Sequence, residues 1–121
     1  MPLLSPSGLS SDVRAAERAI IAVTGVDPRP WFRCPFGAGA DDPRVIAEIE
    51  RLGYRNVGWH VALEDWEPWR TGDAIATDAI AGVTARGDGT VVLLHTWPGG
   101  TAEGLPQMID GLRDAGATFV T

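Results

Sequence analysis

Three short clusters hold the side chains of this sequence that could do chemistry. They are Arg33-Cys34-Pro35-Phe36-Gly37, Glu64-Asp65-Trp66 and His95-Thr96-Trp97. Each cluster follows a short apolar run, at the point where a strand would give way to a loop. A carboxylate beside an imidazole can hold and deliver a proton, and a guanidinium can anchor an anionic group. The clusters would therefore bring an arginine, a carboxylate, an imidazole and several indoles together at one polar site.

The elements that would position these clusters alternate along the chain. Apolar spacing and capping residues predict helices over about 10–25, 41–53, 73–85 and 102–115. Extended apolar runs predict strands over 29–35, 54–63, 90–95 and 117–121. Strands that alternate with helices pair in parallel with right-handed crossovers, so the predicted fold class is α/β. In such folds the carboxyl ends of the strands share one edge, where the three clusters would converge.

Two of these elements carry detailed expectations. The first helix would be capped by Ser10 or Ser11 and would bury a stripe formed by Val13, Ala16, Ile20 and Val23. The strand over 90–95 is apolar at consecutive positions, as in a parallel strand covered by helices on both faces.

Composition narrows the class of protein. The 121 residues fit a single domain, 1–121, and the formal net charge is −6. A negative chain without a basic run argues against nucleic acid or an anionic membrane as partner, and no apolar run is long enough to span a membrane. The single cysteine, Cys34, allows neither an internal disulfide nor a zinc cluster.

The clusters resemble the motifs of one known family. Arg33-Cys34-Pro35-Phe36-Gly37 resembles the R-x-P-[YF]-G motif of the polysaccharide deacetylases (NodB homology domains). Asp65-Trp66 resembles their D-W motif, and Leu93-Leu94-His95 their L-x-H motif. The three stand in the family's order and at fitting separations. The resemblance implies a partial (β/α) barrel of about four parallel strands and four helices. It also implies removal of acetyl groups from N- or O-acetylated carbohydrate.

The resemblance also assigns roles to residues. His95 would be the general acid that protonates the departing amine or alcohol, Asp65 would orient its imidazole, and Arg33 would anchor the catalytic base. The backbone N–H of Phe36 would stabilise the oxyanion, and Leu93 would line the acetyl pocket. The indoles that could contact the sugar are those of Trp66, Trp69 and Trp97.

The family's metal site has no counterpart in this sequence. The resemblance implies a divalent metal (zinc or similar) in the complete domain, held by an aspartate and an H-x-x-x-H pair. The only histidines here are His60 and His95, so those ligands are missing. Ala62 also stands where many members have an aspartate. We therefore expect this chain to be the C-terminal part of such a domain, lacking its N-terminal metal-binding part and having little activity alone.

Less specific interpretations stay open beside these. Arg33 could bridge a loop, His95 could be a satisfied core histidine, and His60 and Cys34 could simply pack. The chain could be a non-catalytic module that binds an acetylated polysaccharide or oligosaccharide through its aromatic cleft. It could also be an assembly unit, since a half barrel has open sheet edges that favour self-association. Family members commonly act on the cell envelope or outside the cell, and the location of this chain stays open.

Overall fold

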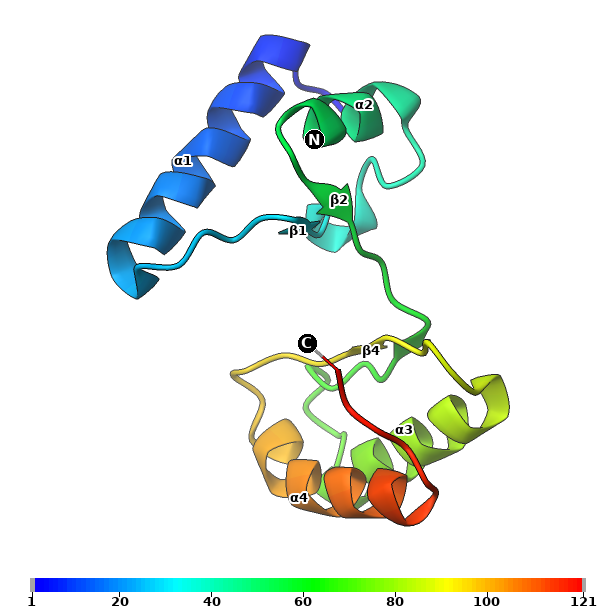
Figure 1. The fold of residues 1–121 in the computed structure, drawn as a ribbon. Helices are drawn as coiled ribbons and strands as arrows, with labels where there is room; N and C mark the ends of the chain where they lie inside the picture. Colours follow the sequence, from blue (N-terminus) through cyan, green and yellow to red (C-terminus); the bar gives the residue numbers. More distant parts are fainter. Residues whose placement is uncertain (1, 121) are drawn as a thin grey trace. The chain divides into compact units, whose positions relative to one another are not determined.

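A computed structural model describes residues 2–120, and the chain divides into two compact units, Met1–Gly58 and Trp59–Thr121. Figure 1 shows the elements of each unit. Unit 1 contains α1 (Pro6–Thr24), β1 (Trp31–Phe32), the short 3-10 helix η1 (Pro35–Gly37), α2 (Pro43–Arg51) and β2 (Arg55–Asn56). Unit 2 contains β3 (Val61–Ala62), α3 (Gly72–Arg86), β4 (Val92–Leu93) and α4 (Gly99–Asp114). No described helix has both the length and the apolar character that a membrane span requires.

Helix α1 begins earlier than the sequence suggested. The hydroxyl of Ser5 accepts a hydrogen bond from the Gly8 N–H, and Pro6 occupies the first turn, so the predicted cap at Ser10 or Ser11 is wrong. A serine followed by proline satisfies an orphan donor and presets the helical φ angle, which explains the early start. Gly25 ends the helix in the left-handed conformation, as predicted.

The buried stripe of α1 is also shorter than predicted. Leu9 and Val13 are buried, whereas Ile20 is 42% and Val23 87% exposed, and Ala16 is exposed as well. The partner helix α2 has 9 residues against 19 in α1, so it is about 14 Å long beside about 28 Å. The shorter helix covers only the first turns of the longer one.

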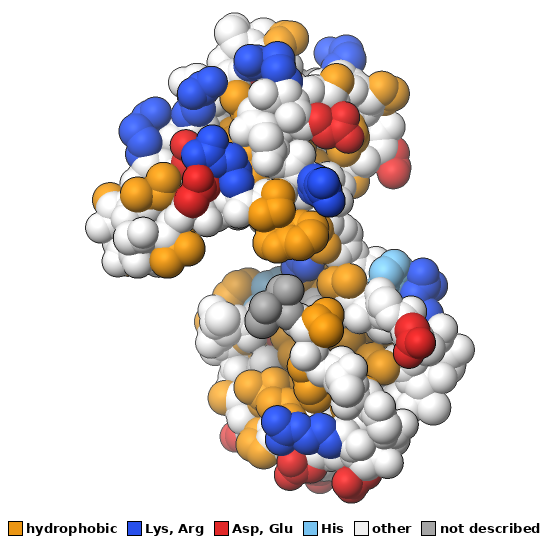
Figure 2. All heavy atoms as spheres, viewed as in Figure 1, with side chains coloured by type: hydrophobic (Ala, Val, Ile, Leu, Met, Phe, Trp, Pro, Cys, Tyr) orange, Lys and Arg blue, Asp and Glu red, His pale blue; other side chains and the backbone are white. Residues whose placement is uncertain are grey.

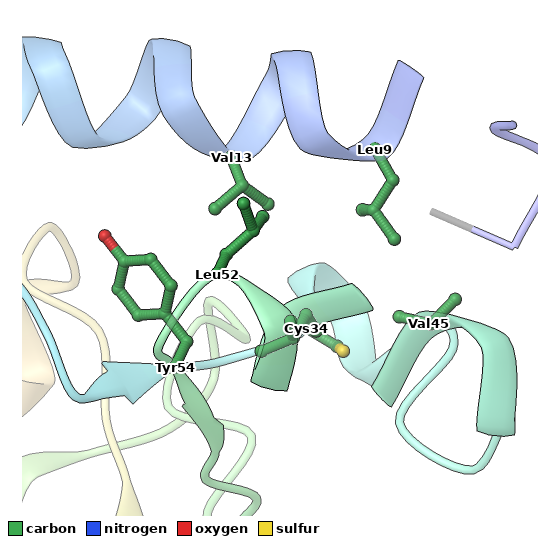
Figure 3. Packing of buried hydrophobic residues seen from close by; sticks show 7 residues of the cluster. Leu9, Val13, Cys34, Val45, Leu52 and Tyr54 are labelled. Carbon is green, nitrogen blue, oxygen red and sulfur yellow. The ribbon is translucent and has the colours of Figure 1, made fainter. Parts of the chain in front are cut away.

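The core of unit 1 lies between α1, α2 and the first strands. Figure 3 shows Leu9 and Val13 of α1 facing Val45 of α2, Leu52 and Tyr54. Cys34 belongs to the same cluster and is 1% exposed, and burial raises the pKa of its thiol. The packing interpretation of Cys34 is therefore the one that the structure supports.

The strands pair in parallel, as predicted, but they are short. Trp31 and Phe32 of β1 pair with Arg55 and Asn56 of β2, while Val61 and Ala62 of β3 pair with Val92 and Leu93 of β4, so there are two separate two-stranded sheets. The single strand predicted over 54–63 is wrong, because β2 and β3 belong to different sheets and the segment through Gly58 separates them.

Unit 2 packs its sheet against two adjacent helices, α3 and α4 (Figure 1). The hydroxyl of Thr71 caps α3 by accepting from the Ala74 N–H. The two helices approach closely at Gly72 and Gly104, where an added Cβ on Gly72 would lie 2.8 Å from the Gly104 nitrogen. The buried core beside this crossing consists of Leu63, Ile75, Ala76, Ala79, Met108 and Leu112.

Two expectations for this part of the chain need correction. The predicted strand over 90–95 is a strand only at Val92 and Leu93, and both are half-buried. The predicted final strand is absent from residues 117–120, which form no regular secondary structure; residue 121 lies outside the described residues. A run of apolar residues forms a strand only where its backbone pairs with a neighbouring strand, and here only Val92 and Leu93 do so.

Apolar side chains also reach the surface of each unit, between arginines and acidic residues (Figure 2). They include Val23 and Val26 in unit 1 and Leu105 and Phe119 in unit 2. Single exposed apolar residues are ordinary on protein surfaces and do not by themselves indicate a binding site.

Candidate functional site

A carboxylate–imidazole pair lies at the carboxyl ends of β3 and β4 in unit 2. Asp65 follows β3 by three residues and His95 follows β4 by two. His95 Nδ1 lies 2.8 Å from Asp65 Oδ1, and the backbone N–H of His95 donates to Asp65 Oδ2 at 2.7 Å. Because β3 and β4 are parallel neighbours, residues that follow them meet at one edge of the sheet.

Asp65 is held as an anion inside the protein. It is 1% exposed, and its oxygens accept from the His95 N–H, from His95 Nδ1 and from the Thr101 hydroxyl. Burial by itself would raise the pKa of Asp65, but the hydrogen bonds from Thr101 and His95 outweigh it and hold the pKa below its ordinary value. A buried carboxylate is stable here because each oxygen has a donor.

Two indoles flank the imidazole. The Trp66 ring stands edge-on to His95 with centroids 5.1 Å apart, and the Trp97 ring is tilted against it at 4.5 Å. Trp66 is 43% and Trp97 70% exposed, whereas the His95 side chain is 24% exposed. The imidazole is therefore accessible in part, within an aromatic frame.

The remaining predicted residues of unit 2 lie nearby in the sequence. Trp69 is 70% exposed in the loop that follows Trp66. Leu93 pairs with Ala62 across the sheet and is half-buried. Its neighbours Val92 and Leu94 pack on the core beside α3 and α4.

Arg33 and Phe36 belong to unit 1. The Arg33 guanidinium donates to the Val57 carbonyl at 3.1 Å and to the Gly58 carbonyl at 3.3 Å, so it ties its loop to the segment after β2. Phe36 is fully exposed and has a left-handed φ of 55°. The loop-bridging interpretation of Arg33 thus has a structural basis, and its predicted catalytic role stays a prediction.

The sequence pattern missed one member of the cluster, Thr101. It is 7% exposed in the first turn of α4, and its hydroxyl donates to Asp65 Oδ2 at 2.6 Å. A threonine in the first turn of a helix, just after two glycines, looks like an ordinary helix-start residue. The position of Thr101 in the chain is the only sequence feature that could have indicated its role. The short segment from β4 to α4 includes His95, so the first turn of α4 lies near the strand ends.

His60 has a structural hydrogen bond. Its Nδ1 accepts from the Val91 N–H at 3.0 Å, and its own N–H donates to the Val91 carbonyl at 2.8 Å. These bonds join the start of β3 to the start of β4, at the opposite end from Asp65 and His95. The interpretation of His60 as a residue of packing or surface agrees with this geometry.

The residues of the described chain do not fit a metal site of the type that the motifs implied. Within residues 2–120, no group of three or more His, Cys, Asp or Glu side chains is placed to hold an ion. Both carboxylate oxygens of Asp65 already accept hydrogen bonds, one from His95 Nδ1 and the other from the His95 N–H and the Thr101 hydroxyl. We therefore assign no metal ligand to these residues.

Fold and site together define a parallel α/β protein with a buried carboxylate–imidazole pair at its strand ends. Comparison with known proteins narrows this class. No family model matches the sequence. The chain is 30% identical over 112 residues to the peptidoglycan-N-acetylmuramic acid deacetylase of Bacillus subtilis, covering 92% of this chain and 41% of that protein.

Solved structures agree with this relationship. A family 4 carbohydrate esterase from Streptomyces lividans, in complex with acetate, is 26% identical with a TM-score of 0.82, over 100% of this chain and 60% of that one. The esterase domain of a multidomain xylanase from the hindgut metagenome of Trinervitermes trinervoides is 27% identical with a TM-score of 0.81, over 100% and 55%. A family 4 pseudoenzyme from Bacillus anthracis, 22% identical with a TM-score of 0.78 over 96% and 38%, shares the fold.

In sequence and in fold, the chain is similar over nearly its whole length to polysaccharide deacetylases and to carbohydrate esterases of family 4. The recognition from three motifs is confirmed, and so is the fold class, a partial α/β barrel with short parallel strands. The chain spans less than half the length of the curated relatives that it matches.

Proposed function

We propose that this chain carries the acid-bearing part of a deacetylase site, which removes acetyl groups from N- or O-acetylated carbohydrate. The observation that carries the proposal is the Asp65–His95 pair, with Asp65 buried and His95 partly accessible. The family relationship supports the hydrolase class.

His95 would act as the general acid. When Nδ1 donates to Asp65, Nε2 is the ring nitrogen that can exchange a proton with a bound substrate. The proton would pass from Nε2 to the amine nitrogen or the alcohol oxygen of the sugar. This transfer would occur as the bond between that atom and the acetyl carbon breaks. Asp65 stays ionised and stabilises the imidazolium while that proton is held.

The motifs assign further substrate contacts to single residues. Trp66, Trp69 and Trp97 offer exposed indole faces on which a sugar ring could stack. The backbone N–H of Phe36 would stabilise the oxyanion, and Arg33 would anchor the catalytic base, as the motif implies. Leu93 would line the pocket for the acetyl methyl group.

A divalent metal belongs to the family pattern, but no step is assigned to it here. The described residues contain no ligand cluster for one. We propose that sequence outside residues 1–121 supplies those ligands and the catalytic base in the working domain. The chain alone would then have little activity.

Acetate release tests the proposal. Acetylated chito-oligosaccharide and acetylated xylo-oligosaccharide are incubated with the chain, with and without added Zn²⁺, and acetate is measured by an enzyme-coupled assay. We expect slow release that His95→Gln lowers by about 100-fold or more, the usual contribution of a general acid. His60→Gln is the matched control, because His60 lies outside the proposed site. Equal release by the wild type and His95→Gln would contradict the role of His95, and no release at all would remove the isolated chain as a hydrolase.

A non-catalytic carbohydrate-binding module is the second candidate. The exposed indoles Trp66, Trp69 and Trp97, together with the missing ligand cluster among residues 2–120, favour it. It predicts that the same oligosaccharides shift the tryptophan fluorescence without metal, and equally in His95→Gln. An unchanged spectrum at millimolar oligosaccharide would exclude this candidate.

A further inference from the structure

The Asp65 carboxylate holds both ends of one loop. Its Oδ2 accepts from the His95 backbone N–H at 2.7 Å and from the Thr101 hydroxyl at 2.6 Å. The segment between these two donors, residues 96–100, contains Trp97 and two glycines. One buried oxygen therefore fixes where the loop leaves β4 and where it enters α4.

The other carboxylate oxygen is thereby left for the imidazole. Asp65 Oδ1 faces His95 Nδ1 at 2.8 Å. A carboxylate can rotate about its Cβ–Cγ bond, and this torsion has broad energy wells. Two donors on Oδ2 and one on Oδ1 select a single orientation of the group.

The Thr101 hydroxyl has no equivalent substitute at this position. The residue is 7% exposed, so water has little access to replace the hydroxyl. The N-cap residue of α4, Pro98, makes no side-chain hydrogen bond. The hydroxyl of Thr101, in the first turn, bonds to Asp65 instead. The N-terminal end of a helix also favours a nearby carboxylate through its partial positive charge.

We propose that Thr101 is a positioning residue of the site, which acts through Asp65 on His95 and on the Trp97 loop. This inference rests on the proposed function for its catalytic meaning. The Thr101 hydroxyl bonds to Asp65 and not to His95, so Thr101 would act through the carboxylate. Thr101 sets the orientation of the Asp65 carboxylate. The carboxylate then orients the imidazole of His95 and holds the two ends of the segment 96–100 together.

The test compares Thr101→Val with Thr101→Ser by NMR of the full chain. Valine keeps the shape of threonine and removes the donor, whereas serine keeps the donor. In the wild type and in Thr101→Ser we expect a slowly exchanging His95 Nδ1 proton and a protected His95 amide. In Thr101→Val we expect loss of the Nδ1 proton signal and amide exchange about tenfold faster, the size of one lost hydrogen bond.

The matched control is Thr77→Val, at an exposed position of α3. It should leave both His95 signals unchanged. If Thr101→Val also leaves them unchanged while its other amides keep wild-type shifts, the proposal is overturned. No substrate or turnover is involved, so this outcome is separate from failure of the acetate assay, which concerns the proposed function.

The wild type gives a second measurement if Thr101→Val does not fold. The Thr101 hydroxyl proton and the His95 amide proton both point to Asp65 Oδ2, so they lie close together. We expect a nuclear Overhauser effect between them and slow exchange of the hydroxyl proton. A hydroxyl proton that exchanges freely and shows no such effect would overturn the proposal.

Discussion

At the scale of single residues, Asp65 makes more hydrogen bonds than its sequence motif predicts. A D-W motif needs only an aspartate near a strand end, whereas the folded chain gives that aspartate three donors and almost no exposure. A buried charge is tolerated only when it is fully paired. Asp65 therefore ties the stability of unit 2 to the geometry of its site.

Replacing Asp65 by Asn should destabilise unit 2 by about 2 kcal/mol, because an amide loses the charge and turns an N–H₂ group toward donors. Urea unfolding at pH 7 measures this change in the free energy of unfolding. Asp88→Asn, in an exposed turn, is the control and should cost little. An unchanged midpoint for Asp65→Asn would mean that the three hydrogen bonds contribute no net stability.

The same residue predicts how stability depends on pH. The folded pKa of Asp65 lies below its ordinary value, so the unfolded chain binds the proton more readily. The contribution of Asp65 is then fully present above a pH of about 4, the ordinary carboxyl range, and is lost as the pH falls through the folded pKa. Unfolding curves between pH 6 and 3 should fall more steeply for the wild type than for Asp65→Asn. Parallel curves would show that Asp65 has an ordinary pKa.

At the scale of elements, most helices were placed correctly from the sequence, although α1 begins earlier than predicted, whereas the extent of the strands was not predicted. Helix α2 lies within the range predicted from the sequence, 41–53, and begins at Pro43 with Asp42 accepting from the Arg44 N–H; a cap and its helix are neighbours in the chain, so local residues indicate it. The strand over 54–63 was misread because pairing partners are remote in the sequence. Nothing in the apolar run itself shows that Asn56 pairs with Phe32 while Val61 pairs with Val92.

The candidate site divides in the same way. Asp65 and His95 were found through motifs that place them after strands, and the parallel pairing of β3 and β4 explains why they meet. Thr101 was missed because its role depends on the path of the loop from β4 to α4. A loop path depends on packing, and local residue preferences do not determine it.

The crossing of α3 and α4 gives a prediction at this scale. Gly104→Ala should destabilise unit 2 by about 1–3 kcal/mol, although alanine is the better helix former, because its Cβ would meet the backbone of Gly72. Thermal unfolding followed by circular dichroism measures the effect. Gly99→Ala is the matched control in the same helix, since an added Cβ there meets nothing within 4 Å. Equal melting of the two variants would show that the helices can move apart without cost.

At the scale of the whole molecule, the two units have separate cores. Ile49 is fully buried in the first cluster and Ile75 is 1% exposed in the second. Neither a composition shift nor a linker marks the chain near Gly58, and we predicted one domain over 1–121. That prediction can be tested by measuring whether a destabilising substitution in one core also destabilises the other unit.

Ile49→Ala should cost about 2–5 kcal/mol through the cavity that it leaves. If the units unfold separately, native-state hydrogen exchange should accelerate in residues 2–58 and stay unchanged in 59–120. Ile75→Ala is the reciprocal variant, and it should accelerate exchange only in 59–120. Acceleration throughout the chain in both variants would instead support one cooperative domain.

Phe36 has a consequence for engineering. Its φ of 55° is a conformation that glycine adopts without strain, and its ring is fully exposed, so the fold gains no burial from it. Selection for thermostability alone would favour glycine or asparagine at this position. Libraries screened by heat resistance would therefore tend to lose this ring, while the backbone N–H that we propose as the oxyanion donor would remain in every variant.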